Sequence, residues 1–200
     1  MTPSVESIID LEKVSAVEGI LRLWLEDPDL TIFCGAWSNG AIMELLPGGR
    51  ARLTGQLYSG RFAGLRDLIL DDGGHHVHLD LGRLSRVCYI VAPSVCFGFR
   101  PSFELRIAAP GIDPLRAFGL GLAIRRPYDD DGLRETAATR YFTRVADHLR
   151  AHPGVVSLAI RPQGSYHEER AADWSAIERL LANDPELRPL REYIPPGGAG

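Results

Sequence analysis

A cluster of histidines follows a glycine-containing turn in the sequence HHVHLD, which spans residues 75–80. Side chains alternate between the two faces of a β-strand, so the sequence predicts that His76, His78 and Asp80 share one face. A rise of about 3.3 Å per residue places the imidazoles of His76 and His78 about 7 Å apart along the strand. Either imidazole can then ligate a metal, or one can ligate while its neighbour hydrogen-bonds the edge of a ligand. The same pattern is also typical of the solvated face of an amphipathic strand.

The sequence lacks the complete residue patterns of other metal sites and of nucleophilic catalysis. A mononuclear zinc or iron site of the cupin kind also begins with His-x-His on a strand, but it needs a glutamate a few residues later, and the next one is Glu104. No Gly-x-Ser-x-Gly sequence is present to place a nucleophilic serine on a strand-to-helix turn. The three cysteines, Cys34, Cys88 and Cys96, have neither Cys-x-x-Cys nor zinc-site spacing, so we expect buried free thiols.

The composition is that of a folded globular protein. The chain contains 200 residues, of which 45% are hydrophobic, and 22 basic residues against 26 acidic ones give a net charge of −4. This mildly acidic balance argues against binding nucleic acid through bulk charge. No apolar stretch approaches the roughly 20 residues of a membrane-spanning helix. The polar, acidic N-terminus lacks the features of a secretory signal, so we expect a cytoplasmic protein.

Arginine supplies nearly all of the positive charge, because Lys13 is the only lysine in the chain. A guanidinium group is planar and offers paired N–H donors, so it holds carboxylates and phosphates through bidentate contacts. Any anion that this protein binds through positive side chains is therefore expected to meet arginine.

The periodicity of apolar residues predicts the elements that position the histidines. Apolar residues recur at three- and four-residue steps in three segments, which predicts helices at 5–26, 132–152 and 174–182. Short alternating segments between glycine- and proline-containing turns predict strands at 31–34, 41–46, 51–58, 75–81, 86–92, 103–108 and 120–125. No long helical crossover separates these strands. The sequence thus predicts an α+β fold, an antiparallel meander with N-terminal and C-terminal helices.

The length fits one domain, expected over residues 1–194. We place its core at 30–160 and a C-terminal helical extension at 161–194, followed by a disordered tail at 195–200 that consists of Pro, Gly and Ala.

A series of motifs runs in order through residues 41–160. LPGGRAR at 46–52 is followed by the polar histidine strand at 76–80 and by an apolar strand that ends at Pro93. A serine-plus-acidic strand, SFELR, follows at 102–106, then a strand from Phe118 to Arg126 and a helical segment. In this order and spacing the chain resembles the cytoplasmic haem-utilisation proteins of the HemS, ChuX and HutX family. Its single unit is closer to ChuX and HutX than to the doubled HemS.

The resemblance implies an antiparallel β fold with helical additions and a role in binding, carrying or processing haem in the cytoplasm. It makes His76 or His78 the axial ligand of the iron, because a neutral imidazole ligates haem iron. It also implies that arginines on nearby strands hold the two haem carboxylates, the candidates being Arg100, Arg106, Arg125 and Arg126. Because side chains alternate along a strand, we expect one of the last two, not both, to face the ligand.

Two alternatives stay open from the residues alone. The same fold without haem would bind another small planar ligand or a protein partner, and a non-haem metal enzyme would use the histidines directly. An exposed strand edge would also offer a route to a homodimer.

Overall fold

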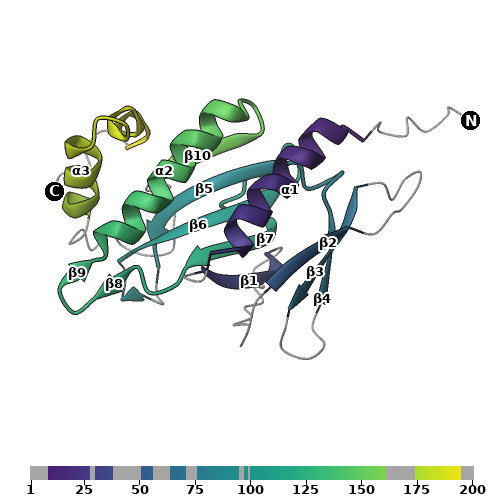
Figure 1. Cartoon of the computed structure of the whole chain (residues 1–200), viewed down its shortest axis with the longest axis horizontal. Helices are drawn as coiled ribbons and strands as arrows, with labels where there is room; N and C mark the ends of the chain where they lie inside the picture. Colours follow the sequence, from purple (N-terminus) through teal and green to yellow (C-terminus); the bar gives the residue numbers. More distant parts are fainter. Residues whose placement is uncertain are drawn as a thin grey trace, which may run out of the picture.

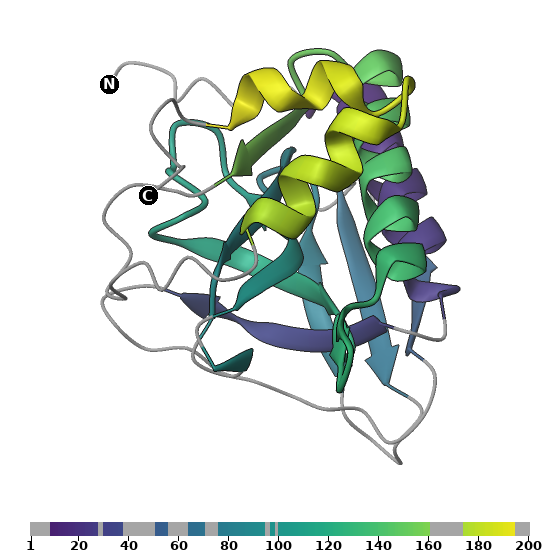
Figure 2. The same cartoon turned by 90° about the vertical axis from the view of Figure 1, so that its left-hand side faces the viewer.

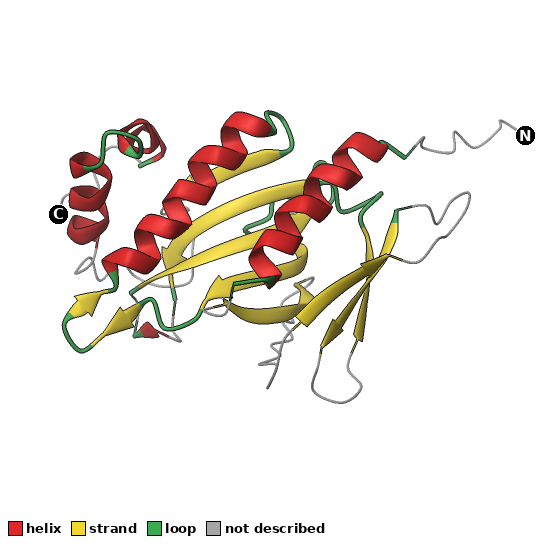
Figure 3. Cartoon of the chain, in the orientation of Figure 1, coloured by secondary structure: helices red, strands yellow, loops and turns green. Residues whose placement is uncertain are grey.

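The computed structural model describes residues 9–27, 30–37, 51–55, 64–70, 76–94, 97–98, 100–160 and 174–194. The elements are, in order, α1 (Leu11–Leu25), β1 (Leu30–Trp37), β2 (Ala51–Gly55), β3 (Leu65–Leu70), β4 (His76–Asp80), β5 (Arg86–Pro93), β6 (Pro101–Ala108), β7 (Phe118–Ile124), β8 (Tyr128–Asp129), β9 (Gly132–Leu133), α2 (Glu135–Ala151), β10 (Val156–Ile160), α3 (Trp174–Asn183) and the 3-10 helix η3 (Arg188–Tyr193). Helices and antiparallel-dominated sheets occur together (Figure 3), so the expected α+β fold is confirmed.

Among the described residues, the strands form a five-stranded sheet in the order β1-β7-β6-β5-β10 and a three-stranded sheet in the order β2-β3-β4. The strands β5, β6 and β7 form an antiparallel meander, and β1 adds to its edge by pairing antiparallel with β7. In contrast, β10 pairs parallel with β5 at the opposite edge. The helix α2 precedes β10 and provides the long crossover that a parallel pairing requires.

The helices α1 and α2 cover one face of the five-stranded sheet (Figures 1 and 2). The side chains that β5, β6 and β7 direct toward them are buried and apolar, and include Tyr89, Phe103 and Leu122. Aromatic rings from the helices pack among these side chains; the ring centroids of Trp24 and Tyr141 lie 6.0 Å apart, edge to face. Burial of this interlayer core is the main term that stabilises the fold.

The described part of the C-terminal extension contributes to the same core. Trp174, Ile177 and Leu181 of α3 and Leu187 and Leu190 are buried in it. Residues 161–173 and the predicted tail at 195–200 lie outside the described residues.

The three-stranded sheet is attached to α1 through its inner face. Leu53, Leu68 and Leu79 belong to the core that also contains the buried side of α1. At the edge of this contact Glu18 of α1 accepts hydrogen bonds from Arg66 of β3 at 2.8 Å and from Arg22 at 2.7 Å. Arg22 also donates to the carbonyl oxygen of Leu53 at 3.0 Å. The three-stranded sheet, which carries the histidines on β4, is therefore held against α1 by apolar packing and by the Glu18 carboxylate, which bonds β3.

Several elements differ from the sequence-based expectation. β3 and β10 were not predicted, although glycine- or proline-containing sequences flank both segments. β9 occupies the first two residues of the helix expected at 132–152, and α2 begins instead at Glu135. The expected strand at 41–46 lies outside the described residues.

None of the described helices has the length and apolar character needed to span a membrane.

Candidate functional site

The candidate site is the outer face of the three-stranded sheet. In β4 His76 and His78 are exposed while Leu79 is buried, which is the alternation expected from the sequence. The antiparallel register with β3 pairs His78 with Asp67 and His76 with Ile69. Directly opposed residues of an antiparallel pair point to the same face. The outer face thus brings together two imidazoles, one carboxylate and one apolar side chain.

The closest contact in the site joins His78 and Asp67. Nδ1 of His78 lies 2.5 Å from Oδ1 of Asp67. The carboxylate can only accept a hydrogen bond, so Nδ1 carries the hydrogen and donates it. In the neutral ring the lone pair then resides on Nε2, the nitrogen on the far side of the imidazole. The Asp67 side chain is 8% exposed and the His78 side chain 57%, so a buried carboxylate orients an imidazole that solvent reaches.

His76 packs against His78 on the same face. The ring centroids of these two histidines lie 5.0 Å apart and their planes make an angle of 82°. The rings are closer than the 7 Å estimated from the strand rise, because the side chains lean toward each other.

Arg52 of β2 extends this face by one strand. Arg52 pairs with Ile69 in the β2–β3 register, and Ile69 pairs with His76, so the three residues form one row across the sheet. The Arg52 side chain is exposed. Further along β2, Thr54 donates a hydrogen bond to the carbonyl oxygen of Asp67 at 3.3 Å. Neither Asp67 nor Arg52 was a candidate from the sequence. A charged residue inside the apolar segment LRDLIL was the one available signal for Asp67.

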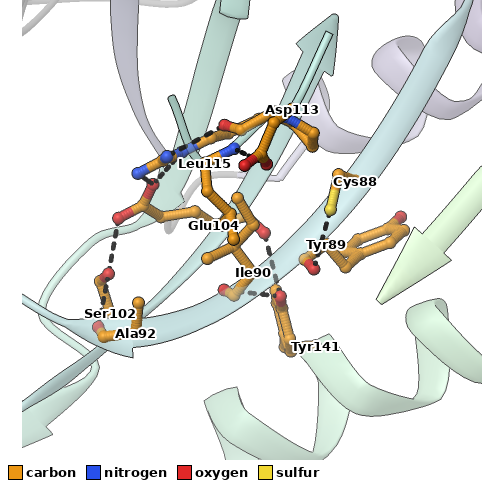
Figure 4. A network of polar contacts seen from close by, with 11 residues as sticks. Cys88, Tyr89, Ile90, Ala92, Ser102, Glu104, Asp113, Leu115 and Tyr141 are labelled. Carbon is orange, nitrogen blue, oxygen red and sulfur yellow. Dashed lines mark hydrogen bonds and ion pairs between the residues drawn. The ribbon is translucent and has the colours of Figure 1, made fainter. Parts of the chain in front are cut away.

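Arg106 lies in β6 and is engaged on the outer face of the five-stranded sheet. Its guanidinium donates from Nε to Glu104 at 2.8 Å and from Nη1 to the carbonyl oxygen of Pro114 at 3.1 Å. It also stacks over the ring of Phe118 at 4.6 Å from the centroid. Glu104 in turn accepts from Ser102 at 2.5 Å, so the carboxylate is shared between two strand neighbours (Figure 4).

Arg100 directly precedes β6 and lies next to the hairpin β8–β9. Its guanidinium carbon is 4.3 Å from the centroid of the Tyr128 ring, and Nε donates to the carbonyl oxygen of Phe97 at 3.2 Å. Arg100 therefore supports the packing of β8 against β6.

Arg125 and Arg126 follow the last residue of β7 and are both exposed. The φ angle of Arg126 is 49°, a left-handed value, so the chain leaves the strand conformation at this point. Strand alternation therefore does not sort these two arginines onto opposite faces. Figure 1 shows the β8–β9 hairpin, which follows them, at the opposite end of the molecule from β4. The fold separates Arg100, Arg125 and Arg126 from the histidine face.

Two surface grooves on the described residues lie away from the histidines. One is formed by α1 and the end of α2 and is lined by Leu11, Glu12, Ser15, Ala16 and His152. The other lies between the start of α2 and the end of α3. Neither groove contains His76 or His78.

Within the part of the chain that the structure describes, no group of three or more His, Cys, Asp or Glu residues is arranged to hold a metal ion. Cys88 is a buried free thiol, as expected, and burial raises its pKa. The side chains of the other two cysteines lie outside the described residues. The strongest local arrangement is therefore the exposed imidazole pair with its buried carboxylate.

A scan against models of known protein families found no match to this chain, and a search of curated proteins found none either.

Proposed function

We propose that this protein binds haem in the cytoplasm, as a carrier or haem-processing protein, and that His78 is the axial ligand of the iron. The observation that supports this proposal is the contact between His78 and Asp67. Histidines that ligate metals commonly donate their second ring N–H to a carboxylate, which fixes the tautomer and makes the ligating nitrogen more basic. Nε2 of His78 is the nitrogen that this contact leaves for iron.

The surroundings of His78 are chemically suited to a flat ligand with acidic edges. Ile69 and Leu65 are partly buried on the same face and would contact the porphyrin through apolar atoms. Arg52 lies two strands from His76, about 10 Å away at the usual spacing of about 4.8 Å between strands. An arginine side chain is long enough to contact a haem carboxylate bound over that row of residues. In this proposal Arg52 takes the role for which Arg100, Arg106, Arg125 and Arg126 were the sequence candidates.

A haem titration followed by Soret absorbance tests the proposal. We expect saturable binding by the wild type and a loss of affinity of about tenfold or more in His78→Ala, since an iron–imidazole bond is removed. His76→Ala is expected to retain the wild-type spectrum, because the second imidazole is not the ligand. His152→Ala removes an imidazole at the end of α2 and serves as the matched control.

Two results would contradict the proposal. Absence of a saturable Soret shift in the wild type would exclude haem as the ligand, and the fold would then serve another small ligand or a protein partner. Unchanged haem spectra in His78→Ala and in the double variant with His76→Ala would exclude this face as the site.

A further inference from the structure

We propose that His76 and His78 together form a binding site for a divalent transition-metal ion of the Zn²⁺ type on the outer face of β4. This inference does not depend on haem binding. Haem iron needs one imidazole from this face, whereas the metal ion needs both at once.

The spacing of the two rings fits a shared ion. Zinc–nitrogen bonds are about 2.0–2.1 Å long and the ion is tetrahedral, which puts the centroids of two imidazoles on one ion roughly 5 Å apart. The centroids of His76 and His78 are separated by 5.0 Å. Two ligands two residues apart on one strand therefore already stand at the separation that chelation requires.

The chemical state of the rings also fits. A metal binds the unprotonated nitrogen of a neutral imidazole. In His78 that nitrogen is Nε2, because Asp67 accepts the hydrogen on Nδ1. Asp67 thereby takes the position of the carboxylate in the carboxylate–histidine–zinc arrangement. Both histidines are exposed, so a hydrated ion reaches them without displacing protein.

The remaining coordination positions would be filled by water. Asp80 shares the face with the histidines, but its carboxylate lies 3.4 Å from Nε of Arg83 and is engaged there. Among the described residues no third His, Cys, Asp or Glu completes the set. Two imidazoles favour Zn²⁺, Cu²⁺ and Ni²⁺, whereas Mg²⁺ and Ca²⁺ prefer oxygen ligands. The site is therefore expected to bind Zn²⁺, Cu²⁺ or Ni²⁺ in preference to Mg²⁺ or Ca²⁺, because its ligand atoms are nitrogens.

Metal and haem would exclude each other at this face. Nε2 of His78 has one lone pair, so a chelated ion blocks the iron ligand of the proposed haem site. Zinc is then expected to weaken haem binding in the wild type, and this competition disappears in His76→Ala, where the chelate is broken.

The experiment is a calorimetric titration of the chelator-treated protein with Zn²⁺ alone. We expect one ion per chain, and a loss of affinity of about tenfold or more in both His76→Ala and His78→Ala. His152→Ala should bind zinc as the wild type does, and Mg²⁺ should give no saturable heat. Lack of saturable zinc binding by the wild type would overturn the inference. Binding that survives in both single variants would overturn it as well, because the ion would then lie elsewhere.

The variants separate this inference from the haem proposal. His76→Ala should lose zinc and keep haem, while His78→Ala should lose both. Zinc binding that needs both histidines, in a protein that does not bind haem, would refute the haem proposal and support the metal site. Haem binding through His78, in a protein that does not bind zinc, would do the reverse.

Discussion

The hydroxyl oxygen of Tyr89 lies 2.5 Å from Nδ1 of His148 in the centre of the protein. The same hydroxyl accepts a hydrogen bond from Nε1 of Trp24 at 3.1 Å. Because Trp24 supplies the hydrogen of that bond, the Tyr89 hydroxyl is free to donate its own hydrogen to His148. The three residues come from α1, β5 and α2, so one buried chain of hydrogen bonds connects both helices to the sheet. His148 is 7% exposed, and this arrangement requires its neutral form.

The first prediction is that stability falls as the solution is made acidic. Burial lowers the pKa of His148, and the neighbouring His152 lowers it further. The unfolded chain therefore binds a proton more readily than the folded one, so the stability due to neutral His148 is present above about pH 6.5 and is lost as the pH falls toward the lowered folded pKa. Urea unfolding at pH 7.5, 6.5 and 5.5 measures this loss. His148→Gln should show a flatter dependence; parallel losses in both proteins would contradict the assignment.

Tyr89→Phe is predicted to destabilise the protein by about 1–3 kcal/mol, since it leaves two buried polar groups without their partner. Burial raises the pKa of Tyr89, so its hydroxyl remains a donor throughout the neutral range. Chemical denaturation measures the effect. Tyr193→Phe is the matched control, at a tyrosine that is only partly buried, and should change stability by about 0.5 kcal/mol or less. Equal stabilities of the two variants would show that the buried bonds contribute little.

Glu18→Gln is predicted to loosen the three-stranded sheet from α1. Burial acts to raise the pKa of Glu18, but hydrogen bonds and charge from Arg22 and Arg66 outweigh burial and leave the pKa lowered. Its contribution is thus present above the ordinary value of 4.5 and is lost as the pH falls through the lowered folded value.

At neutral pH we expect this variant to lose about 1.5–3 kcal/mol of unfolding free energy, the range for hydrogen bonds to a charged group. Amide exchange should rise in β2 and β3 more than in β5 and β6. Arg83→Ala removes an ion pair whose arginine is 85% exposed and should have a negligible effect. Uniform changes in exchange across both sheets would rule out a local role.

Gly64→Ala is predicted to destabilise the end of the β3–β4 pair by about 1–3 kcal/mol, the range for overpacking. A Cβ atom at Gly64 would lie 2.4 Å from the backbone nitrogen of Gly82, and backbone cannot move aside as a side chain does. Gly19→Ala is the contrasting variant. A Cβ there meets nothing within 4 Å, and alanine is the better helix former, so we expect stabilisation by about 0.5–1 kcal/mol. Thermal unfolding compares the two; shifts of the same sign would contradict this prediction.

Variants of three arginines test which of them contacts the haem carboxylates in the proposed site. Arg52→Ala should weaken haem binding and reduce its dependence on salt, because Arg52 lies in the same row as His76. Arg125→Ala and Arg126→Ala should leave haem affinity unchanged, since the hairpin that follows them is at the other end of the molecule (Figure 1). Haem titration at low and moderate salt measures these affinities. A larger loss of haem affinity in Arg125→Ala or Arg126→Ala than in Arg52→Ala would show that haem binds away from β4.

The sequence by itself determined which side chains share a face within β4. His76 and His78 point outward and Leu79 inward, because alternation is a property of the extended backbone at each residue. The apolar stripe of α2, with Tyr141, Phe142 and Val145, followed in the same way from the helical period and is buried as expected. Such features depend on neighbours along the chain, so local patterns predict them.

The partners of these faces were decided by the tertiary structure alone. Asp67 orients His78 because the β3–β4 register sets them opposite each other, and a shift of one residue would turn the carboxylate to the other face. The parallel pairing of β10 with β5 joins segments that are far apart in sequence. Arg125 and Arg126 could each hold a carboxylate, but β7 ends before them at Ile124 and the backbone at Arg126 is left-handed. The register and pairing of strands depend on the packing of the whole core, so local periodicity does not predict them.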